Sequence, residues 1–469
     1  MRARVSCFLA VSLLAGCAKY QARPLQPPRL ERAYYERSLN DPALQHYVEA
    51  NIGTTETKWP PRSIDLKTLT LISYYYSASL DVARAHLSAA EAGIQVARAR
   101  INPGLNVSAG YDLNPDSHFD RGIGPFFTVE TAGKRGYRIL RAEAEAESAL
   151  NTFAEASWQL RSSVRAAFFN HLLAAARFEL VDHEVEVRRE IVEIFERRLA
   201  VGEAPRPELD IYRVNLITAD AALRRSRGEV TETRAALANA VGLPSDVLST
   251  VTWTAPGFET PAQPEALPVS AVQRAGVLHR ADVRRSLSDF AAADASLRLE
   301  LARQYPDLVL SPAYEFQEAF ARYMLNATLE PLALFHRNQG PIAVAVAQRE
   351  EVAAKFEALQ AKAIGELETA LIRYRAAFEQ WQEASELITV QRDREQAARR
   401  AMAAGEGDRL AVATARLETV TAARARLDAL ADVQTAMGAL EDAMQQPLED
   451  ALTVPAVPRV GPRKGAPTQ

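Results

Sequence analysis

The sequence predicts a mainly α-helical fold with short β-hairpins, in which a unit of one helix, one hairpin and one long helix occurs twice. Long stretches without proline indicate the helices, and short runs of alternating residues indicate the strands. The third observation is an internal repeat, because separate blocks of similar sequence recur at one constant offset. The 469 residues are enough for a large buried core.

The first residues have the composition of a bacterial lipoprotein signal. Two arginines precede an apolar run over 5–14 that is too short to span a membrane, and small residues lead up to Cys17. We expect a signal peptide over 1–16, lipid attachment at Cys17, and a lipidated, extended segment over 17–62. Ala18 follows the cysteine. By resemblance to known lipoproteins, an aspartate at this position would indicate retention in the inner membrane, so we expect sorting to the outer membrane. An ordinary signal with a chance cysteine is the alternative.

The long helices are predicted from the distribution of proline, which is absent from 126–204, 208–243 and 342–446. Proline costs about 3 kcal/mol inside a helix, so these stretches favour uninterrupted helices. Apolar residues in the first stretch fall on two 3–4 stripes: Val181, Val185, Val192, Phe195 and Leu199, and Leu180, Val187, Ile191 and Ile194. Two stripes indicate two neighbouring helices. A helix of about 65 residues would be roughly 100 Å long, which suits a bundle or a helical wall.

The internal repeat has an offset of 203 residues. Residues 101–111 match 304–314, residues 200–203 match 403–406, and Ala236, Leu237, Ala240 and Pro244 match Ala439, Leu440, Ala443 and Pro447. Three separated blocks at one offset indicate a duplication rather than a coincidence.

Each repeat is expected to follow one plan. The first covers 63–244, with a hairpin at about 104–131 and a tip turn at about 202–207. The second covers 269–448, with a hairpin at about 307–330 and a tip turn at about 405–408. The opening helices are expected over about 63–101 and 269–304. A linker over 245–268 joins the repeats, and the tail 449–469 is expected to be disordered.

The two hairpins allow two interpretations. They could form a small soluble sheet that caps a helical bundle, or they could be membrane strands. Four strands are too few to close a barrel, and open strand edges are not tolerated in lipid. Membrane strands would therefore require a barrel shared between subunits, with eight strands from two chains or twelve from three.

Composition and motifs argue against several function classes. The net charge is −4, so no strongly basic surface indicates nucleic-acid binding. Two cysteines and seven scattered histidines give neither a disulfide scaffold nor a zinc motif. The sequence has no phosphate loop, nucleophile elbow or dinucleotide fingerprint. We therefore predict no catalysis, no cofactor and no metal centre.

Two motifs stand where a strand is expected to turn into a long helix. The first contains Glu130, Lys134 and Arg135 in the string Glu-Thr-Ala-Gly-Lys-Arg. The second is the string Arg337, Asn338, Gln339 and Gly340. Taken alone, both strings are typical of a strand-to-helix turn with a helix cap.

With these motifs and the repeat, residues 63–448 resemble the TolC family of outer-membrane efflux ducts, and the motifs resemble its cation-efflux branch. The resemblance implies a homotrimer. Its twelve-stranded β-barrel would lie in outer-membrane lipid and continue into a long α-helical barrel across the periplasm. A periplasmic adaptor protein and a proton-driven inner-membrane pump of the RND type are the implied partners.

The resemblance also assigns roles to the two tip turns. Gly202 and Glu203, with Gly405, Glu406 and Gly407, would contact the adaptor, since glycine allows a tight turn and close approach. Asp210, Asp408 and Arg409 are candidate gate residues, because like charges brought together by symmetry repel one another and salt bridges can hold them. Ordinary helix turns and solvated charges are the alternative interpretation.

The function predicted from the sequence is a passive exit duct of a tripartite efflux system, with heavy-metal cations as the candidate substrate. The partner pump would supply the energy. Two alternatives stay open: a lipidated coiled-coil scaffold without a pore, and the outer-membrane duct of type I protein secretion.

Overall fold

The computed structural model describes residues 20–52, 59–61, 63–111, 119–264, 279–317, 320–332 and 335–448. The expected signal peptide, Cys17 and the expected tail 449–469 lie outside the described residues. The chain divides into two compact units, Met1–Ser38 and Leu39–Gln469. The described part of the smaller unit contains helix α2 (Pro27–Tyr35), which has no buried residue.

The prediction of an extended segment over 17–62 is wrong, because its described residues include helices. Helix α2 begins with Pro27 and Pro28, and helix α3 (Pro42–Ile52) begins with Pro42. Proline suits the first turn of a helix, where its fixed φ is already helical and its missing N–H would have no partner. These prolines therefore mark two helix starts rather than an extended tether.

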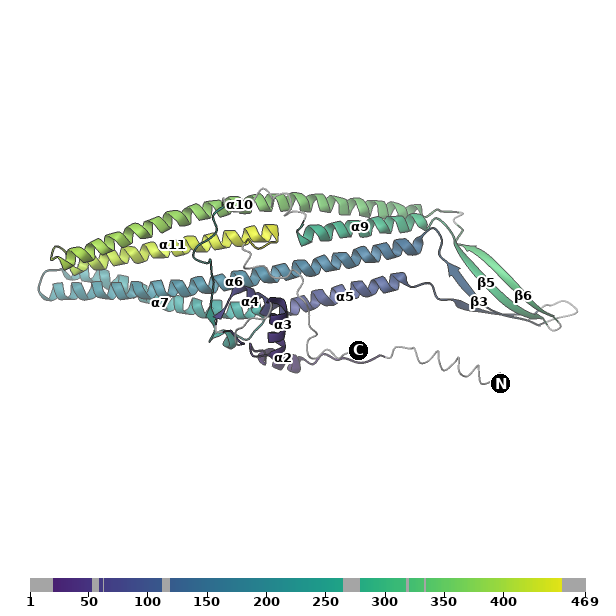
Figure 1. Ribbon diagram of the computed structural model, residues 1–469, viewed down its shortest axis with the longest axis horizontal. Helices are drawn as coiled ribbons and strands as arrows, with labels where there is room; N and C mark the ends of the chain where they lie inside the picture. Colours follow the sequence, from purple (N-terminus) through teal and green to yellow (C-terminus); the bar gives the residue numbers. More distant parts are fainter. Residues whose placement is uncertain are drawn as a thin grey trace. The chain divides into compact units, whose positions relative to one another are not determined.

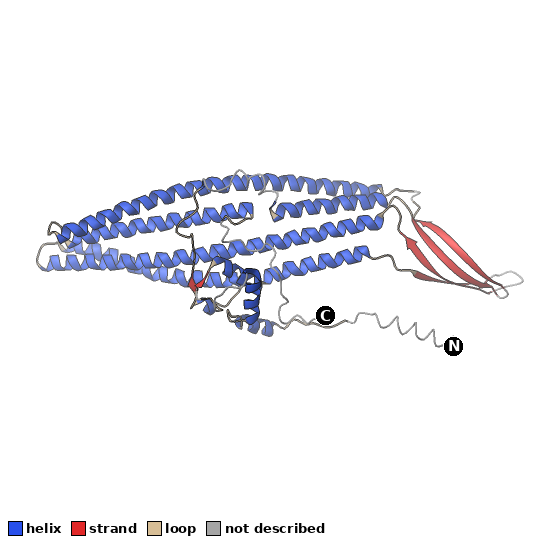
Figure 2. Cartoon of the chain, in the orientation of Figure 1, coloured by secondary structure: helices blue, strands red, loops and turns tan. Residues whose placement is uncertain are grey.

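Within the larger unit, long helices lie side by side (Figures 1 and 2). The first repeat contains α4 (Leu66–Tyr76), α5 (Ala78–Arg98), α6 (Lys134–Ala200) and α7 (Arg206–Val241). The second contains α9 (Ala281–Ala302), α10 (Gln339–Ala403) and α11 (Arg409–Met444). Helices α6 and α10 have 67 and 65 residues, and α7 and α11 have 36 each. The predicted mainly helical, duplicated fold is confirmed.

The helices form a layer with two open edges. Near the tip turns the order is α10, α11, α6 and α7, and each helix contacts the next (Figure 1). Near the strands the order is α10, α9, α6 and α5. In both halves the central contact joins the two repeats. Helix α10 forms one edge, and α7 and α5 form the other.

The opening helix of the first repeat is divided, whereas a single helix over 63–101 is the expectation from sequence. Ser77 has an extended backbone and separates α4 from α5, and its Oγ accepts a hydrogen bond from Leu80 N at 3.3 Å. Serine is a preferred N-cap, so it starts a new helix at this point. In the second repeat, residues 265–278 lie outside the described ranges.

The four main strands form one antiparallel sheet in the order β2, β3, β5, β6. Their bounds are β2 Gly104–Tyr111, β3 Phe119–Val129, β5 Asp307–Gln317 and β6 Phe320–Glu330. Strands β3 and β5 join the two hairpins, with Ile123 opposite Tyr314. Strands β2 and β6 are the edges. A short parallel pair, β1 (Ser63–Ile64) with β4 (Thr252–Trp253), lies apart from this sheet.

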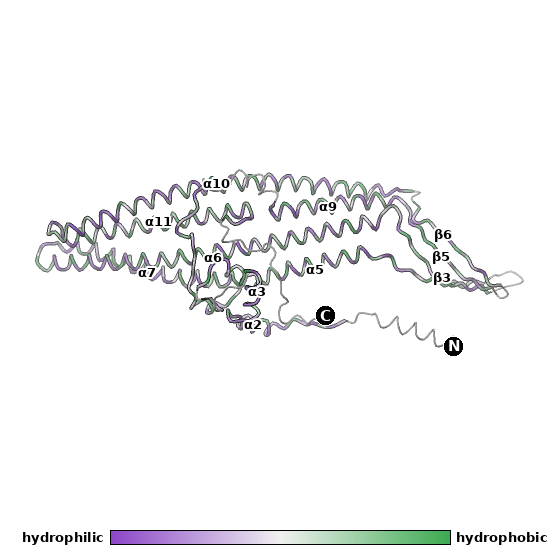
Figure 3. Tube along the Cα trace, in the orientation of Figure 1, coloured by the Kyte–Doolittle hydropathy of each residue, from purple (hydrophilic) through white to green (hydrophobic). Residues whose placement is uncertain are grey.

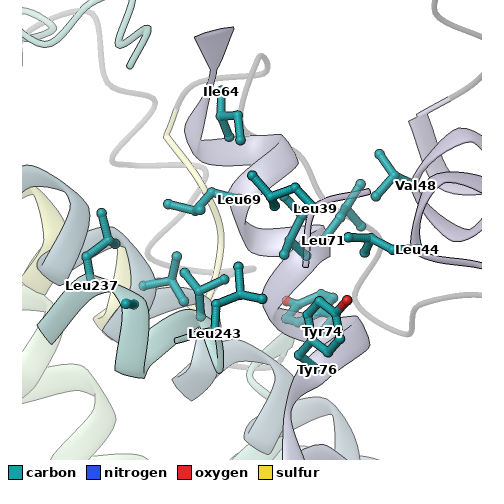
Figure 4. Packing of buried hydrophobic residues seen from close by; sticks show 14 of the residues in the cluster. Leu39, Leu44, Val48, Ile64, Leu69, Leu71, Tyr74, Tyr76, Leu237 and Leu243 are labelled. Carbon is teal, nitrogen blue, oxygen red and sulfur yellow. The ribbon is translucent and has the colours of Figure 1, made fainter. Parts of the chain in front are cut away.

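The largest hydrophobic core surrounds α4. Leu44, Leu69, Leu71, Leu237 and Leu243 are fully buried there, around the position of Tyr74 (Figure 4). The connection between the repeats contributes to this region, so it is more than a tether. The Trp253 ring meets Phe168 at 5.7 Å, and the Phe258 ring stacks on Phe169 at 5.3 Å.

His171 is one of the packed residues of α6, in keeping with its place on an apolar stripe. Its Nδ1 lies 3.2 Å from Thr233 Oγ1 of α7, and its ring meets Trp253 edge-on. Burial, assisted by nearby Arg234, lowers the pKa of the His171 imidazole, which favours the neutral form. Polar and apolar residues alternate along the helices (Figure 3). No helix within the described ranges has an apolar stretch long enough to cross a membrane.

Candidate functional site

The first strand-to-helix motif forms a compact polar junction between β3 and α6. Lys134 is buried, and its Nζ donates to Asp307 Oδ1 at 2.8 Å and to Tyr305 O at 2.7 Å. Glu130 Oε2 accepts from Arg138 Nη2 at 3.0 Å, and Arg135 Nη2 donates to Arg98 O at 2.6 Å. The motif therefore ties the start of α6 to the second hairpin and to the end of α5.

The second motif holds the start of α10. Asn338 has a left-handed backbone, with φ of 59°, and its Nδ2 donates to Glu300 O at 2.8 Å and to Glu300 Oε2 at 2.9 Å. Gln339 Oε1 accepts from Arg337 N at 3.2 Å. A Cβ on Gly340 would meet nothing within 4 Å in the chain. Asn338 explains the turn, whereas no contact within the chain requires glycine at position 340.

A cavity of about 480 Å³ lies between the two motifs. Its lining carries both charges, including Glu130, Arg138, Asp307 and Arg303, with His336. Nowhere in the described part of the chain do three His, Cys, Asp or Glu side chains form a group that could hold a metal ion. Around this cavity Lys134 pairs with Asp307, Arg138 with Glu130, and Arg303 with Glu300. The geometry assigns these groups to fixing strands on helices.

The sheet beyond this junction has one apolar and one polar face. Residues that pair across an antiparallel register share a face, and neighbours along a strand alternate between faces. The apolar face comprises Leu105, Val107, Ala109, Tyr111, Phe119, Ile123, Pro125, Phe127, Val129, Leu308, Leu310, Pro312, Tyr314, Phe316, Ala321, Tyr323, Leu325, Ala327 and Leu329. Among the described residues, Arg121 is the one charged side chain on this face, and it lies over the Phe119 ring.

The apolar face is uncovered, and the opposite face is polar. On the apolar face Tyr323 is 87% exposed and Leu325 is 70% exposed. The opposite face carries mostly Asn, Ser, Thr and Gly residues and a pair between Glu315 and Arg322 at 2.7 Å, together with the apolar residues Phe126, Val309, Ala313 and Met324. This division is typical of a transmembrane strand, which has one face toward lipid and one toward water.

The two tip turns share one geometry. Gly202 and Gly405 have φ of 79° and 80°, in the left-handed region that glycine adopts without strain. Glu203 N donates to Arg198 O at 2.8 Å, and Glu406 N donates to Ala401 O at 2.9 Å. These bonds satisfy carbonyls at the ends of α6 and α10. The glycine and glutamate residues of both turns are exposed.

A row of ion pairs joins the helical hairpin α6–α7 to the helical hairpin α10–α11 next to these turns. Because it runs between α6 and α11, we call it the α6–α11 seam. It consists of Arg198 with Asp408 at 2.7 Å, Glu190 with Arg409 at 3.2 Å and Arg416 at 2.7 Å, Glu184 with Arg424 at 2.6 Å, and Arg177 with Asp428 at 2.5 Å. Asp408 also accepts from Ala411 N at 2.8 Å, so it caps α11 as well. Both helices contribute acids and bases to the seam, and its middle part pairs two glutamates of α6 with three arginines of α11.

Sequence reasoning found only part of the seam. Asp408 and Arg409 lie in it, whereas Asp210 lies exposed on α7, 3.9 Å from Arg213. Glu406 is exposed in its turn. The partners Glu190 and Arg416 were missed. The seven-residue spacing of arginines 409 and 416 is the signal that could have found them, because it places both on one helix face.

A buried ionic centre continues the contact between α6 and α11 toward the middle of the layer. The Glu441 side chain is 1% exposed, and its Oε2 lies 3.1 Å from Arg161 Nη1 and 3.2 Å from Arg165 Nε. Its Oε1 accepts from Leu448 N at 2.9 Å. A Cβ on Gly438 would come within 2.5 Å of Arg165 Nη1, so glycine makes room for this arginine.

Comparison with known proteins gives similarities in sequence to outer-membrane efflux proteins. Residues 76–243 match the family described as outer membrane efflux protein. The chain is 27% identical over 318 residues to the cobalt-zinc-cadmium resistance protein CzcC of Cupriavidus metallidurans, and the match covers 65% of this chain and 72% of that protein.

Solved structures support the fold. The outer membrane protein VceC of Vibrio cholerae has a TM-score of 0.64 and 19% identity, covering 82% of this chain and 97% of its own. The open state of the MtrE outer membrane channel of Neisseria gonorrhoeae has a TM-score of 0.65 and 16% identity, covering 83% of this chain and 91% of its own. The predicted resemblance is confirmed.

The buried centre gives a stability prediction. Glu441→Gln removes the charge that both arginines face, and breaking a buried ion pair costs on the order of 3–5 kcal/mol. Glu418→Gln, on the same helix, removes an exposed partner of Arg394 at 3.3 Å and is expected to cost below about 1 kcal/mol. Thermal unfolding followed by circular dichroism compares the two variants. Equal midpoints would contradict the assigned role of Glu441.

Proposed function

We propose that this chain, which resembles outer membrane efflux proteins in sequence and in fold, is one subunit of an outer-membrane exit duct. The observation that carries the proposal is the sheet with a bare apolar face, a polar face and two open edges. Such a sheet is unsuited to water because it exposes apolar side chains, and unsuited to lipid as one chain because its edges are unpaired. Copies of the chain placed edge to edge remove both conflicts.

The helical layer supports the same arrangement. The edges of the helical layer and of the sheet come from the same repeats. The second repeat supplies β6 and α10 at one edge, and the first repeat supplies β2, α5 and α7 at the other. The central contacts β3 with β5, α6 with α9, and α6 with α11 each join the first repeat to the second. If the same kind of contact forms between the edge of one copy and the opposite edge of the next, the interface is heterologous. Such an interface produces a closed ring when the rotation from copy to copy adds up to a full turn. By resemblance to the family, we propose three copies.

The proposed duct conducts passively and does not catalyse a reaction. Energy would come from a proton-driven inner-membrane pump, reached through a periplasmic adaptor. We assign the adaptor contact to the exposed turns with Gly202, Glu203, Gly405, Glu406 and Gly407, and retain Asp210, Asp408 and Arg409 as gate candidates. Cys17 would carry the lipid anchor.

Heavy-metal cations are the substrate class that we propose. Support comes from the two strand-to-helix motifs and from the similarity to a relative named for cobalt, zinc and cadmium resistance. The non-pore scaffold is disfavoured, because a scaffold in water would have to leave the apolar sheet face uncovered.

The lipid-facing assignment predicts a difference between two neighbouring positions on β6. Leu325→Arg places a charge on the apolar face, at a cost of roughly 2–4 kcal/mol near the middle of the membrane. Asn326→Arg places the same charge on the polar face and should be tolerated. The measurement is the amount of assembled protein in outer-membrane fractions. Equal assembly of both variants would count against membrane strands.

Growth of a deletion strain tests the substrate class. We expect the deletion strain to be more sensitive to cobalt, zinc or cadmium salts than the parent strain. The wild-type gene should restore tolerance, and the Leu325→Arg variant should not. Drug gradients run in parallel serve as the control. Sensitivity to drugs with unchanged tolerance of metals would reject the cation assignment and leave the duct in place.

A further inference from the structure

The duplication turns the α6–α11 seam into a template for a contact that the single chain lacks. Helices α7 and α11 begin at 206 and 409, and helices α6 and α10 end at 200 and 403. Both differences equal the repeat offset of 203. Each residue of the seam therefore has a counterpart 203 positions away in the other repeat. The counterpart of an α6 residue lies on α10, and the counterpart of an α11 residue lies on α7.

The central cluster of the seam keeps its charges in these counterparts. Glu190 corresponds to Asp393, and Arg409 and Arg416 correspond to Arg206 and Arg213. The other ion pairs are not retained. Glu184 and Arg424 correspond to Leu387 and Ala221, Arg198 and Asp408 to Ala401 and Pro205, and Arg177 and Asp428 to Gln380 and Arg225.

The counterpart residues lie at opposite edges of the helical layer. Asp393 is exposed on α10 and Arg206 is exposed on α7, and neither forms an ion pair with any described residue. Arg213 donates to Glu196 of its own hairpin at 2.7 Å, with its side chain 46% exposed. The opposite charges are thus presented outward by two helices that make no substantial contact with each other in the chain.

Apolar residues accompany these charges on both helices. Ile211, Val214 and Ile217 are exposed on α7, and Leu387 and Val390 are exposed on α10. Three of these positions have apolar counterparts that are buried or half-buried: Val214, Ile217 and Val390 correspond to Leu417, Val420 and Val187. Ile211 and Leu387 correspond to Thr414 and Glu184. The two edges therefore expose apolar side chains at three positions whose counterparts on α6 and α11 are covered.

We propose that α7 of one copy packs against α10 of a second copy, with Asp393 between Arg206 and Arg213 of the neighbour. The proposal rests on the proposed function, since it places the contact within the ring of subunits. In the template, one carboxylate receives two arginines at 3.2 and 2.7 Å that lie seven residues apart on one helix face. The occupant of each edge is therefore a second copy of this chain.

Cross-linking tests the contact. A chain with Asp393→Cys and Arg206→Cys is purified in detergent and treated with a short bis-maleimide. We expect covalent dimers and trimers on a denaturing gel. The matched control, Glu190→Cys with Arg409→Cys, should link only within the monomer, and the chain without added cysteines should not link.

The outcomes separate this proposal from the proposed function. If light scattering finds an oligomer, while the Asp393 and Arg206 cysteines link no subunits and the control pair links, the contact is wrong and the duct stands. If light scattering finds single chains, the duct itself is rejected.

A charge reversal supplies a second readout that does not depend on cysteine reactivity. Asp393→Arg should lower the temperature at which the oligomer dissociates, and adding Arg206→Asp and Arg213→Asp to the same chain should raise it again. A reversal with no effect on dissociation, or with no recovery in the combined variant, would overturn the proposed contact.

Discussion

The joint between the two repeats is the constraint on which the rest of the structure depends. Helix α6 meets α11 through the buried Glu441, faced by Arg161 and Arg165, and through the ionic seam that runs to the tip turns. A buried carboxylate is costly unless it is paired, so the centre fixes one alignment of the two helices. That alignment sets the order of the helical layer, and the junction of Lys134 with Asp307 carries the same order into the sheet.

The single layer of helices in one chain has two edges that do not meet. A closed wall therefore requires more than one copy of the chain. In the part of the chain that the structure describes, the joint satisfies the inner contacts and leaves α10, β2 and β6 at edges. Helix α7 lies at the other edge of the helical layer, where α4 contacts part of it. In the ring that we propose, the copies would enclose a space lined by the polar face of the sheet. The proposed passage would separate cargo from lipid and periplasm, a role for which no reactive groups are required.

Much of this organisation could be predicted from the sequence, because it depends on local rules. Missing prolines predicted the long helices, and the glycines at 202 and 405 predicted the reversals. The proline-rich start was misjudged, since Pro27 and Pro42 begin helices. The buried centre could not be predicted, because in the sequence Glu441 resembles any solvent-exposed glutamate of a helix. Its burial depends on Arg161, which is 280 residues away in the sequence. Strand register likewise required the pairing of distant segments.

The central claim is that the chain becomes a closed structure only with copies of itself. Native mass spectrometry of the particle released from detergent measures this most directly, because it counts chains without a folding assay. The account predicts a mass of three chains. A particle with the mass of one chain, with its apolar sheet face accessible to water, would contradict it.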